Sequence, residues 1–504
     1  MDITELSRLV AQRRFGEAQQ LYTQLSAKES GSAELLRLGA AIAASSSSPA
    51  HALALLERAV RLAPGNAGLH ADLAQLYQQT GQFGEAAAQW RRCHLLVPHN
   101  LDVLERVAQT SDSAGHWAEA ADAYLALHRA GRRTPHLKLR LAAMLHSLRR
   151  VDEAEPYFQE LMREAQTSPV RWEYDMQLLL TGRFDPGWDY YEDRFTVFGH
   201  DKLHCYAFPY PAWNGQPLAG KTLLLHGEQG LGDEIMYCSL VNELSAQAKR
   251  VIVACAPALV DLFRHSFPNA EIVAHPRGSP EQWRHSPPQL PFSAPPDYQV
   301  PMGSAPRFLR RRLSDFDGAR AYLAAEPQRV AAFEARLRES ESGKPPFRIG
   351  LVWSGNLRTG AMGQRKSIPL ALFKPFCGMA GARFVSLQNA DYGDQTGQLP
   401  ELRIADFSRE LTDFSATAAL AACMDLIIAV DTSVVHLVGA MGKPTWLPLW
   451  QAADWRWLWQ ADRSIWYPDV HLFRQSVPGD WQPVIDEMQR RLAERLRSSA
   501  PAAA

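Results

Sequence analysis

The chain has 504 residues with a formal net charge of −1, and 46% of the residues are hydrophobic and 21% charged. This composition is typical of a folded globular protein with more than one domain, and it excludes disordered and collagen-like chains. Because 53 Lys and Arg residues balance 54 Asp and Glu residues, no global positive field exists to hold a nucleic acid. Any binding site must therefore be local.

No apolar run approaches the roughly 20 residues that a membrane-spanning helix needs, and the start of the chain lacks the apolar core of a signal peptide. The six cysteines are widely spaced without a C-x-x-C pair. This pattern indicates a reducing compartment and no structural zinc. We therefore expect a cytoplasmic protein with no integral membrane segment, no disulfides and no bound metal.

Repeats with a period of 34 residues occupy the first third of the chain. The period is carried by small residues in Ala-rich stretches, at Ala18, Ala52, Ala86, Ala120 and Ala154. Within one unit Leu69, Leu73 and Tyr77 fall on one helical stripe, so each unit is predicted to be a helical hairpin. Over residues 1–168 the pattern resembles the tetratricopeptide repeat. We expect the alanines to pack between helices, and the array to hold a protein partner.

Beyond the array, which we place in residues 1–181, a linker rich in aromatic residues and proline is predicted in 182–216. Short apolar runs then alternate with helical stretches, which predicts parallel sheets with helical crossovers. The expected strands are Thr222–Leu225, Val251–Ala254, Ile272–Ala274, Ile349–Trp353, Phe384–Leu387, Leu426–Val430 and Thr445–Pro448. Proline-rich stretches at Pro276–Pro306 and Gly343–Pro346 divide the series. We expect two Rossmann-like doubly wound domains, residues 217–342 and 343–504, with a cleft between them.

Three clusters of polar residues follow predicted strands, where such folds bind ligands. The first contains His226, Glu228, Gln229, Gly230, Gly232 and Asp233. Its glycines allow the backbone to approach a ligand closely. Asp233 is either a functional carboxylate or only a helix N-cap.

The second cluster contains Ser354 and Asn356, followed by Arg365 and Lys366. The two cations either neutralise a diphosphate or belong to a solvated basic loop. The third cluster contains Asp431, Thr432, Ser433 and His436. Thr432 and Ser433 are predicted at a helix N-terminus, where phosphate oxygens bind. Asp431 is alternatively a structural anchor, and His436 a packed core histidine.

Read together, the motifs resemble bacterial proteins that join tetratricopeptide repeats to a heptosyltransferase-like glycosyltransferase domain with the GT-B fold. The resemblance runs from about residue 182 to residue 490. It is carried in order by GWDYYEDRF, PAWNGQPLAGKTLLLHGEQGLGDEIMY, GLVWSGN, RKSIPL, FVSLQ, DFSATAALAACMDLIIAVDTSVVHLVGAMGKPTW, DWRW and WYPDVHLFRQSVPGDW. The layout of repeats and catalytic domain is also similar to that of protein O-linked N-acetylglucosamine transferase.

The resemblance implies a role for each cluster. In the heptosyltransferase-like family the Gly-Asp pair, here Gly232-Asp233, supplies the base that deprotonates the acceptor hydroxyl. The basic residue near the leaving phosphate corresponds to Lys366 or Arg365. The donor-gripping segment corresponds to Asp431, Thr432, Ser433 and His436. No metal or cofactor is implied beyond the nucleotide-sugar donor, because cations and helix N-termini stabilise the diphosphate. Gln388 follows a strand where the nucleoside is expected.

We therefore expect an inverting glycosyltransferase that acts on a protein, such as flagellin or another surface protein, held by the repeats. One alternative is a heptosyltransferase-like enzyme acting on lipopolysaccharide. This alternative assigns no function to the repeats. Another is a non-catalytic scaffold with a decayed transferase domain. Seven of the 14 tryptophans lie near the C-terminus, and we interpret them as packing across the two lobes rather than as a sugar-stacking platform.

Overall fold

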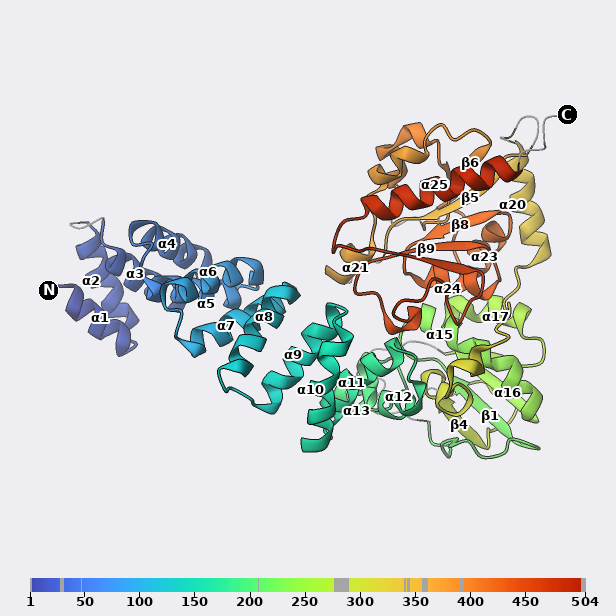
Figure 1. Cartoon of the computed structure of the whole chain (residues 1–504), viewed down its shortest axis with the longest axis horizontal. Coiled ribbons are helices and arrows are strands. Elements are labelled where there is room, and N and C mark those ends of the chain that lie inside the picture. The colour runs from blue at the N-terminus through green and yellow to red at the C-terminus, as the bar shows by residue number, and fades with distance from the viewer. Residues whose placement is uncertain are drawn as a thin grey trace. The chain divides into compact units, whose positions relative to one another are not determined.

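The computed structural model describes residues 2–499 except 28–30, 47, 207, 276–289, 340, 342–344, 356–360 and 390–393. The chain divides into two compact units (Figure 1). The first, Met1–Gln166, is called the repeat unit below, and the second, Thr167–Ala504, the α/β unit.

The repeat unit is a succession of helical hairpins. Its helices are α1 (Ile3–Ala11), α2 (Phe15–Ser26), α3 (Ala33–Ser45), α4 (Pro49–Leu62), α5 (Ala67–Gln79), α6 (Phe83–Leu96), α7 (Leu101–Ser113), α8 (Trp117–Arg129), α9 (Pro135–Ser147) and α10 (Val151–Glu164). Asn66 and Asn100, one repeat apart, cap α5 and α7 by accepting backbone N–H groups with their side-chain oxygens. The five alanines that carry the 34-residue period are fully buried. The predicted helix-to-helix packing of these positions is confirmed.

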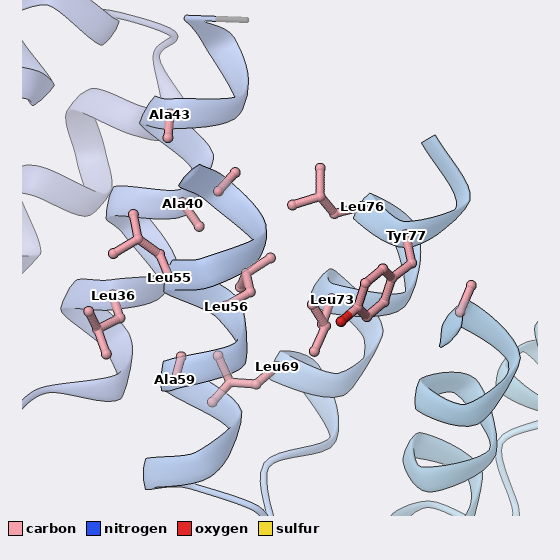
Figure 2. Close-up of a cluster of buried hydrophobic side chains, with 12 residues drawn as sticks. Leu36, Ala40, Ala43, Leu55, Leu56, Ala59, Leu69, Leu73, Leu76 and Tyr77 are labelled. Carbon is pink, nitrogen blue, oxygen red and sulfur yellow. The ribbon is translucent and has the colours of Figure 1, made fainter. Parts of the chain in front are cut away.

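The core of the repeat unit is built from contacts between neighbouring hairpins. Figure 2 shows one cluster, in which leucines of α3, α4 and α5 interlock around small side chains. Tyr77 belongs to this cluster, and its hydroxyl donates a hydrogen bond of 2.7 Å to Glu57 Oε1. Each hairpin thus buries its apolar face on the next one, which is how repeat arrays form a continuous core.

The α/β unit begins with a further helical hairpin, α11 (Ser168–Leu180) and α12 (Phe184–Tyr191), followed by α13 (Arg194–Val197) and α14 (Gly199–Lys202). A Cβ atom on Gly187 would lie 2.8 Å from Leu179 Cδ2, so glycine permits the close approach of α12 to α11. The segment 182–216, which was expected to be a linker, contains the three helices α12, α13 and α14 in its described part. The compact α/β unit starts at Thr167, before the predicted array boundary at residue 181.

A four-stranded parallel sheet forms the first lobe of the α/β unit. Its strands are β1 (Thr222–His226), β2 (Arg250–Cys255), β3 (Glu271–Ala274) and β4 (Tyr298–Pro301), in the order β3-β2-β1-β4. The helices between and after them are α15 (Leu231–Tyr237), α16 (Val241–Gln247), α17 (Val260–Ser266), α19 (Pro306–Leu309) and α20 (Pro327–Glu339). Strand β4 is not among the expected strands, because it lies within the proline-rich stretch Pro276–Pro306, which predicts a break in the series.

A six-stranded parallel sheet forms the second lobe. Its strands are β5 (Phe347–Val352), β6 (Ala382–Ser386), β7 (Ala405–Asp406), β8 (Leu426–Ala429), β9 (Thr445–Leu449) and β10 (Val470–Arg474), in the order β10-β9-β8-β5-β6-β7. The accompanying helices are α21 (Ala361–Lys366), α23 (Phe414–Ala422), α24 (Ser433–Ala440) and α25 (Gln482–Ser499), with the short 3₁₀ turn η9 (Trp455–Trp457). The strands β7 and β10 were not predicted. The expected parallel-sheet architecture is confirmed.

Both sheets reverse their strand order at one point. In the first lobe the chain runs outward from β1 to β3 and returns to the other side of β1 as β4; in the second it runs from β5 to β7 and returns beside β5 as β8. In parallel sheets, ligands bind outside the carboxyl ends of strands at such reversals. The three polar clusters follow β1, β5 and β8, the strands that flank these points.

Candidate functional site

The N-termini of α15 and α24 meet in the α/β unit, although they lie far apart in the sequence. A Cβ atom on Gly232 would be 2.8 Å from His436 Cδ2 and 3.3 Å from Ser433 Cα. Residue 232 must therefore be glycine for the first turn of α15 to pack against the first turn of α24. This contact brings the first and third polar clusters together.

Asp233 lies in the first turn of α15 and has a cationic partner from the second lobe. Its Oδ2 accepts the backbone N–H of Gly230 at 2.9 Å. Gly230 is the N-cap residue of α15 and Asp233 lies three residues later, so the expectation that Asp233 is only an N-cap is wrong. Its Oδ1 accepts Arg456 Nη2 at 2.5 Å. Arg456 Nη1 is 2.6 Å from Asp454 Oδ1. The carboxylate thus bonds back to the N-cap residue of its own helix and also forms an ion pair between the two lobes.

Lys366 and Asp431 form a second ion pair close to this one, with Nζ 2.7 Å from Oδ2. Burial by itself would lower the pKa of Lys366, but the charges of Asp431 and Asp454 outweigh it and raise that pKa. Lys366 is therefore a cation at neutral pH. Thr432 is the N-cap residue of α24 but makes no capping hydrogen bond with its side chain. Its Oγ1 is buried without a partner among the described residues.

His436 lies one turn into α24 and is buried among aromatic side chains. Its Nδ1 is 3.0 Å from the hydroxyl of Tyr467, and its ring stacks on Trp457 at 5.1 Å with an interplanar angle of 25°. Burial lowers the pKa of His436 to about 4, so the ring is neutral at physiological pH. His436 is thus a packed core histidine, as one interpretation expected. It also borders Gly232, which is the position that the donor-site interpretation requires.

The cluster after β5 is organised around side-chain contacts to backbone. Ser354 N–H donates to Gln388 Oε1 at 3.3 Å, and Gln388 Nε2 donates to the carbonyl of Ser354 at 3.1 Å. Ser367 Oγ accepts the N–H of Gly355 at 2.9 Å. The Arg365 guanidinium lies over the Trp450 ring at 5.9 Å. Asn356, also predicted in this site, lies outside the described residues.

The remaining residues of the first cluster hold the turn after β1. Glu228 is fully buried, and its Oε1 accepts Arg194 Nη2 at 2.8 Å. His226 is fully buried with Nε2 2.8 Å from Gln299 Oε1, and burial lowers its pKa to about 4. Gln229 has a φ of +59°, and its Nε2 donates to the Tyr191 hydroxyl at 2.8 Å. These side chains therefore anchor the loop that presents Gly232 and Asp233.

Two parts of this arrangement were missed from the sequence. The Asp454–Arg456 pair lies in the DWRW segment, one of the motifs that carry the family resemblance, but the motif assigns no role to its arginine. Arg194 lies in the GWDYYEDRF segment and pairs with Glu228, 34 residues later in the chain. The signal available was a charged residue placed within an aromatic motif. Its partner could not be identified from sequence spacing.

The C-terminal tryptophans pack across the two lobes, as the sequence analysis favoured. Trp466 of the second lobe makes edge contacts with Tyr237 and Phe316 of the first lobe, with ring centroids 6.2 and 4.8 Å apart. Trp455 contacts Trp188 of α12 at 5.4 Å. The tryptophan-rich segment around η9 thereby fixes Arg456 next to the turn that carries Asp233.

Among the described residues, no helix combines the length and the apolar character needed to cross a membrane. Within the same part of the chain, no group of three or more His, Cys, Asp and Glu side chains is arranged to hold a metal ion.

Comparison with known proteins identifies the repeats. A tetratricopeptide-repeat family model matches residues 43–89, and this match agrees with the 34-residue recurrence of buried alanines. Solved structures similar to the chain include YrrB, described as a TPR protein with an unusual peptide-binding site, at 12% identity, TM-score 0.30, covering 35% of this chain and 92% of that one. Another is MamA AMB-1, at 20% identity and TM-score 0.29, covering 32% of this chain and 91% of that one.

A curated relative covers more of the sequence. Protein FlbA of Caulobacter vibrioides is 31% identical over 345 residues, which is 64% of this chain and 54% of that protein. The chain thus spans about half the length of this relative. The repeats indicate a role in binding another protein.

Proposed function

We propose that the α/β unit transfers a sugar from a nucleotide-sugar donor to a protein held by the repeat unit. The observation that carries this proposal is the contact of Gly232 with His436 and Ser433. It joins the Gly-Asp pair to the Asp-Thr-x-x-x-His segment. These are the two segments that provide the base and the donor site in the heptosyltransferase-like family that the sequence resembles.

In the proposed reaction Asp233 is the general base. The acceptor hydroxyl oxygen forms a bond to the anomeric carbon while its proton passes to the Asp233 carboxylate. The bond between the anomeric carbon and the phosphate oxygen breaks, and the nucleoside diphosphate leaves with the electron pair. Attack opposite the leaving group inverts the anomeric centre. The Asp233 side chain is 21% exposed, so a hydroxyl group from solvent can reach it.

The leaving diphosphate is assigned to the N-terminus of α24 and to Lys366. Backbone N–H groups at a helix N-terminus bind phosphate oxygens. Support comes from Thr432, whose buried hydroxyl has no partner among the described residues and does not cap the helix itself. Lys366 supplies a positive charge, and its stabilising effect increases as negative charge develops on the departing diphosphate. Arg365, Ser354, Gln388 and Ser433 are retained as donor-side residues, and no metal ion is required.

A protein acceptor is proposed because the chain carries a tetratricopeptide-repeat array. Such arrays bind extended peptide segments or folded partners, and flagellin or another surface protein is the acceptor class we favour. A glycolipid acceptor offers no peptide for the repeats to bind. The repeat unit therefore selects the protein, and the α/β unit performs the transfer.

The test has a binding step and a transfer step. Sugar nucleotides are screened by thermal shift on the full chain, because a ligand that binds only the folded state raises its apparent stability. Intact masses of flagellin and surface proteins are then compared between cells with and without this protein. Asp233→Asn should lower transfer by about 10²- to 10⁴-fold while donor binding persists. The control is Asp261→Asn, which changes an exposed carboxylate on α17.

Two outcomes contradict the proposal. Full transfer by Asp233→Asn removes Asp233 from the role of base. A screen in which no sugar nucleotide shifts the unfolding temperature favours a scaffold without catalytic activity.

A further inference from the structure

Arg456 is the cation nearest to Asp233, and it has more than one carboxylate partner. Its Nη2 lies 2.5 Å from Asp233 Oδ1, and its Nη1 lies 2.6 Å from Asp454 Oδ1. Nη2 also lies 3.5 Å from Gln229 Oε1, and the guanidinium lies over the Trp455 ring at 4.5 Å. Asp454 and Trp455 adjoin Arg456 in the chain, whereas Asp233 and Gln229 belong to the other lobe. The Nη2 contacts are therefore the ones that can open while Arg456 stays anchored.

The charges around this pair are nearly balanced. In the ion pairs formed here by the described residues, two cations, Lys366 and Arg456, are bound to three carboxylates, Asp233, Asp431 and Asp454. Each cation is thus already paired with a carboxylate in the structure. A diphosphate that binds to Lys366 or Arg456 therefore competes with a carboxylate for that cation.

Arg456 is also the cation suited to exchange its partner. Its Nε is buried without a hydrogen-bond partner among the described residues. A guanidinium binds phosphate through two parallel N–H donors in a planar fork. Arg456 can therefore turn about its contact with Asp454 and present Nε and Nη2 to one phosphate group. Lys366 has no such fork.

We propose that Arg456 is exchanged between Asp233 and the diphosphate of the donor, so that donor binding releases the carboxylate that acts as base. This inference rests on the proposed function. Without donor, Arg456 occupies Asp233 Oδ1 and keeps the carboxylate in an ion pair. With donor bound, Nη2 moves to a phosphate oxygen and Oδ1 becomes available to the acceptor hydroxyl. Arg456 is thus a positioning residue that ties activation of the base to the presence of the donor.

The exchange makes a prediction that a purely structural ion pair does not make. If Asp233 competes with phosphate for Arg456, removing the charge of Asp233 must strengthen diphosphate binding. By the same linkage, removing Arg456 must weaken binding and abolish the gain from the Asp233 change. A structural pair predicts instead that both single changes weaken binding or leave it unchanged.

The experiment measures dissociation constants on the full chain by isothermal titration calorimetry. The probes are inorganic pyrophosphate and the diphosphates of uridine, guanosine, cytidine, adenosine and thymidine. We expect Asp233→Asn to bind the preferred nucleoside diphosphate about tenfold more tightly than the unmodified protein, and Arg456→Ala to bind it about tenfold more weakly. The double variant should match Arg456→Ala within about twofold.

Further variants separate folding from exchange. Arg456→Lys keeps the positive charge beside Asp454, so it should fold normally and bind with intermediate affinity. Arg463→Ala, an exposed arginine in the same region, is the matched control and should bind like the unmodified protein. Thermal unfolding of each variant identifies any loss of fold.

Each contrary result has one meaning. Equal or weaker binding by Asp233→Asn overturns the exchange and leaves the proposed function intact. The same tenfold gain in the Arg456→Ala background also overturns it, because the Asp233 charge then acts on the ligand without Arg456. If the unmodified protein binds neither pyrophosphate nor any of the nucleoside diphosphates, both the exchange and the proposed function fail.

Discussion

The repeat unit and the α/β unit differ in how far the partners of a buried cation are exposed to solvent. In the repeat unit the buried Lys138 pairs with Glu160 and Glu164, whose side chains remain 42% exposed. In the α/β unit both Arg194 and Glu228 are completely buried. In this array, where each hairpin contacts only its neighbours, the partners of Lys138 stay at the surface. In the α/β unit Arg194 of α13 contacts the turn after β1, both partners are enclosed, and the same turn leads to Gly232 and Asp233 of the candidate site.

The largest predicted difference concerns these two buried cations. Arg194→Met leaves the Glu228 carboxylate buried and unpaired, so it should lower the free energy of unfolding by about 3–5 kcal/mol. Lys138→Met leaves its glutamates in contact with water, so the loss should be below about 1 kcal/mol. Urea unfolding of the full chain measures both.

A double variant separates the effect of the unpaired charge from a loss of packing. Combining Arg194→Met with Glu228→Leu should recover most of the stability, because an apolar pair can replace a buried ion pair. Similar losses for Arg194→Met and Lys138→Met would show that enclosure of both charges does not distinguish the two units.

The buried histidines of the α/β unit predict acid sensitivity. Burial lowers the pKa of both His226 and His436 to about 4, below the ordinary value near 6.5. The unfolded chain then binds more protons than the folded one between these values, so stability is complete above about pH 6.5 and falls as the pH decreases towards 4. Each histidine should lower the free energy of unfolding by about 2 kcal/mol between pH 7 and pH 5.

His226→Gln tests this acid sensitivity directly. The glutamine keeps a donor for Gln299 but does not titrate, so its unfolding free energy should fall by about 2 kcal/mol less between pH 7 and pH 5. His265→Gln changes an exposed histidine on α17 and is the control. An unchanged pH dependence in His226→Gln would contradict the prediction.

Glycine-to-alanine changes should have opposite signs in the two units. Gly232→Ala forces a Cβ atom to 2.8 Å from His436 Cδ2, so it should destabilise the protein by about 1–3 kcal/mol and impair transfer. Gly84→Ala in α6 meets no atom within 4 Å, so it should stabilise by about 0.4–1 kcal/mol. Thermal unfolding and the transfer assay measure the two effects. A neutral Gly232→Ala would mean that the helix N-termini need not touch.

The smallest predicted effect is at the surface of the repeat unit. Arg14 pairs with Glu17 at 2.5 Å, but both side chains are about half exposed. Arg14→Ala should therefore leave the free energy of unfolding unchanged within the error of the measurement. Denaturant unfolding provides the measurement, and a loss as large as that of Arg194→Met would place this pair with the enclosed pair of the α/β unit.

The degree to which the sequence could be interpreted also differs between the units. In the repeat unit the alanine period, the helix stripes and the packing all follow from local spacing, because each hairpin contacts only the next. In the α/β unit the strands preceding the three clusters were identified from apolar runs. The strand β4 was hidden by surrounding prolines. Arg456 was visible only as part of a motif, because the residue it contacts lies in another lobe.

The sequence by itself determined the repeat array, the parallel-sheet alternation and the residue types placed after β1, β5 and β8. It did so because helical and strand periodicity are local properties of the chain. Only the tertiary structure decided that Gly232 packs on His436, that Arg194 neutralises Glu228 and that Arg456 pairs with Asp233. These contacts join distant segments, and their distances arise from how the helices and the two sheets pack together.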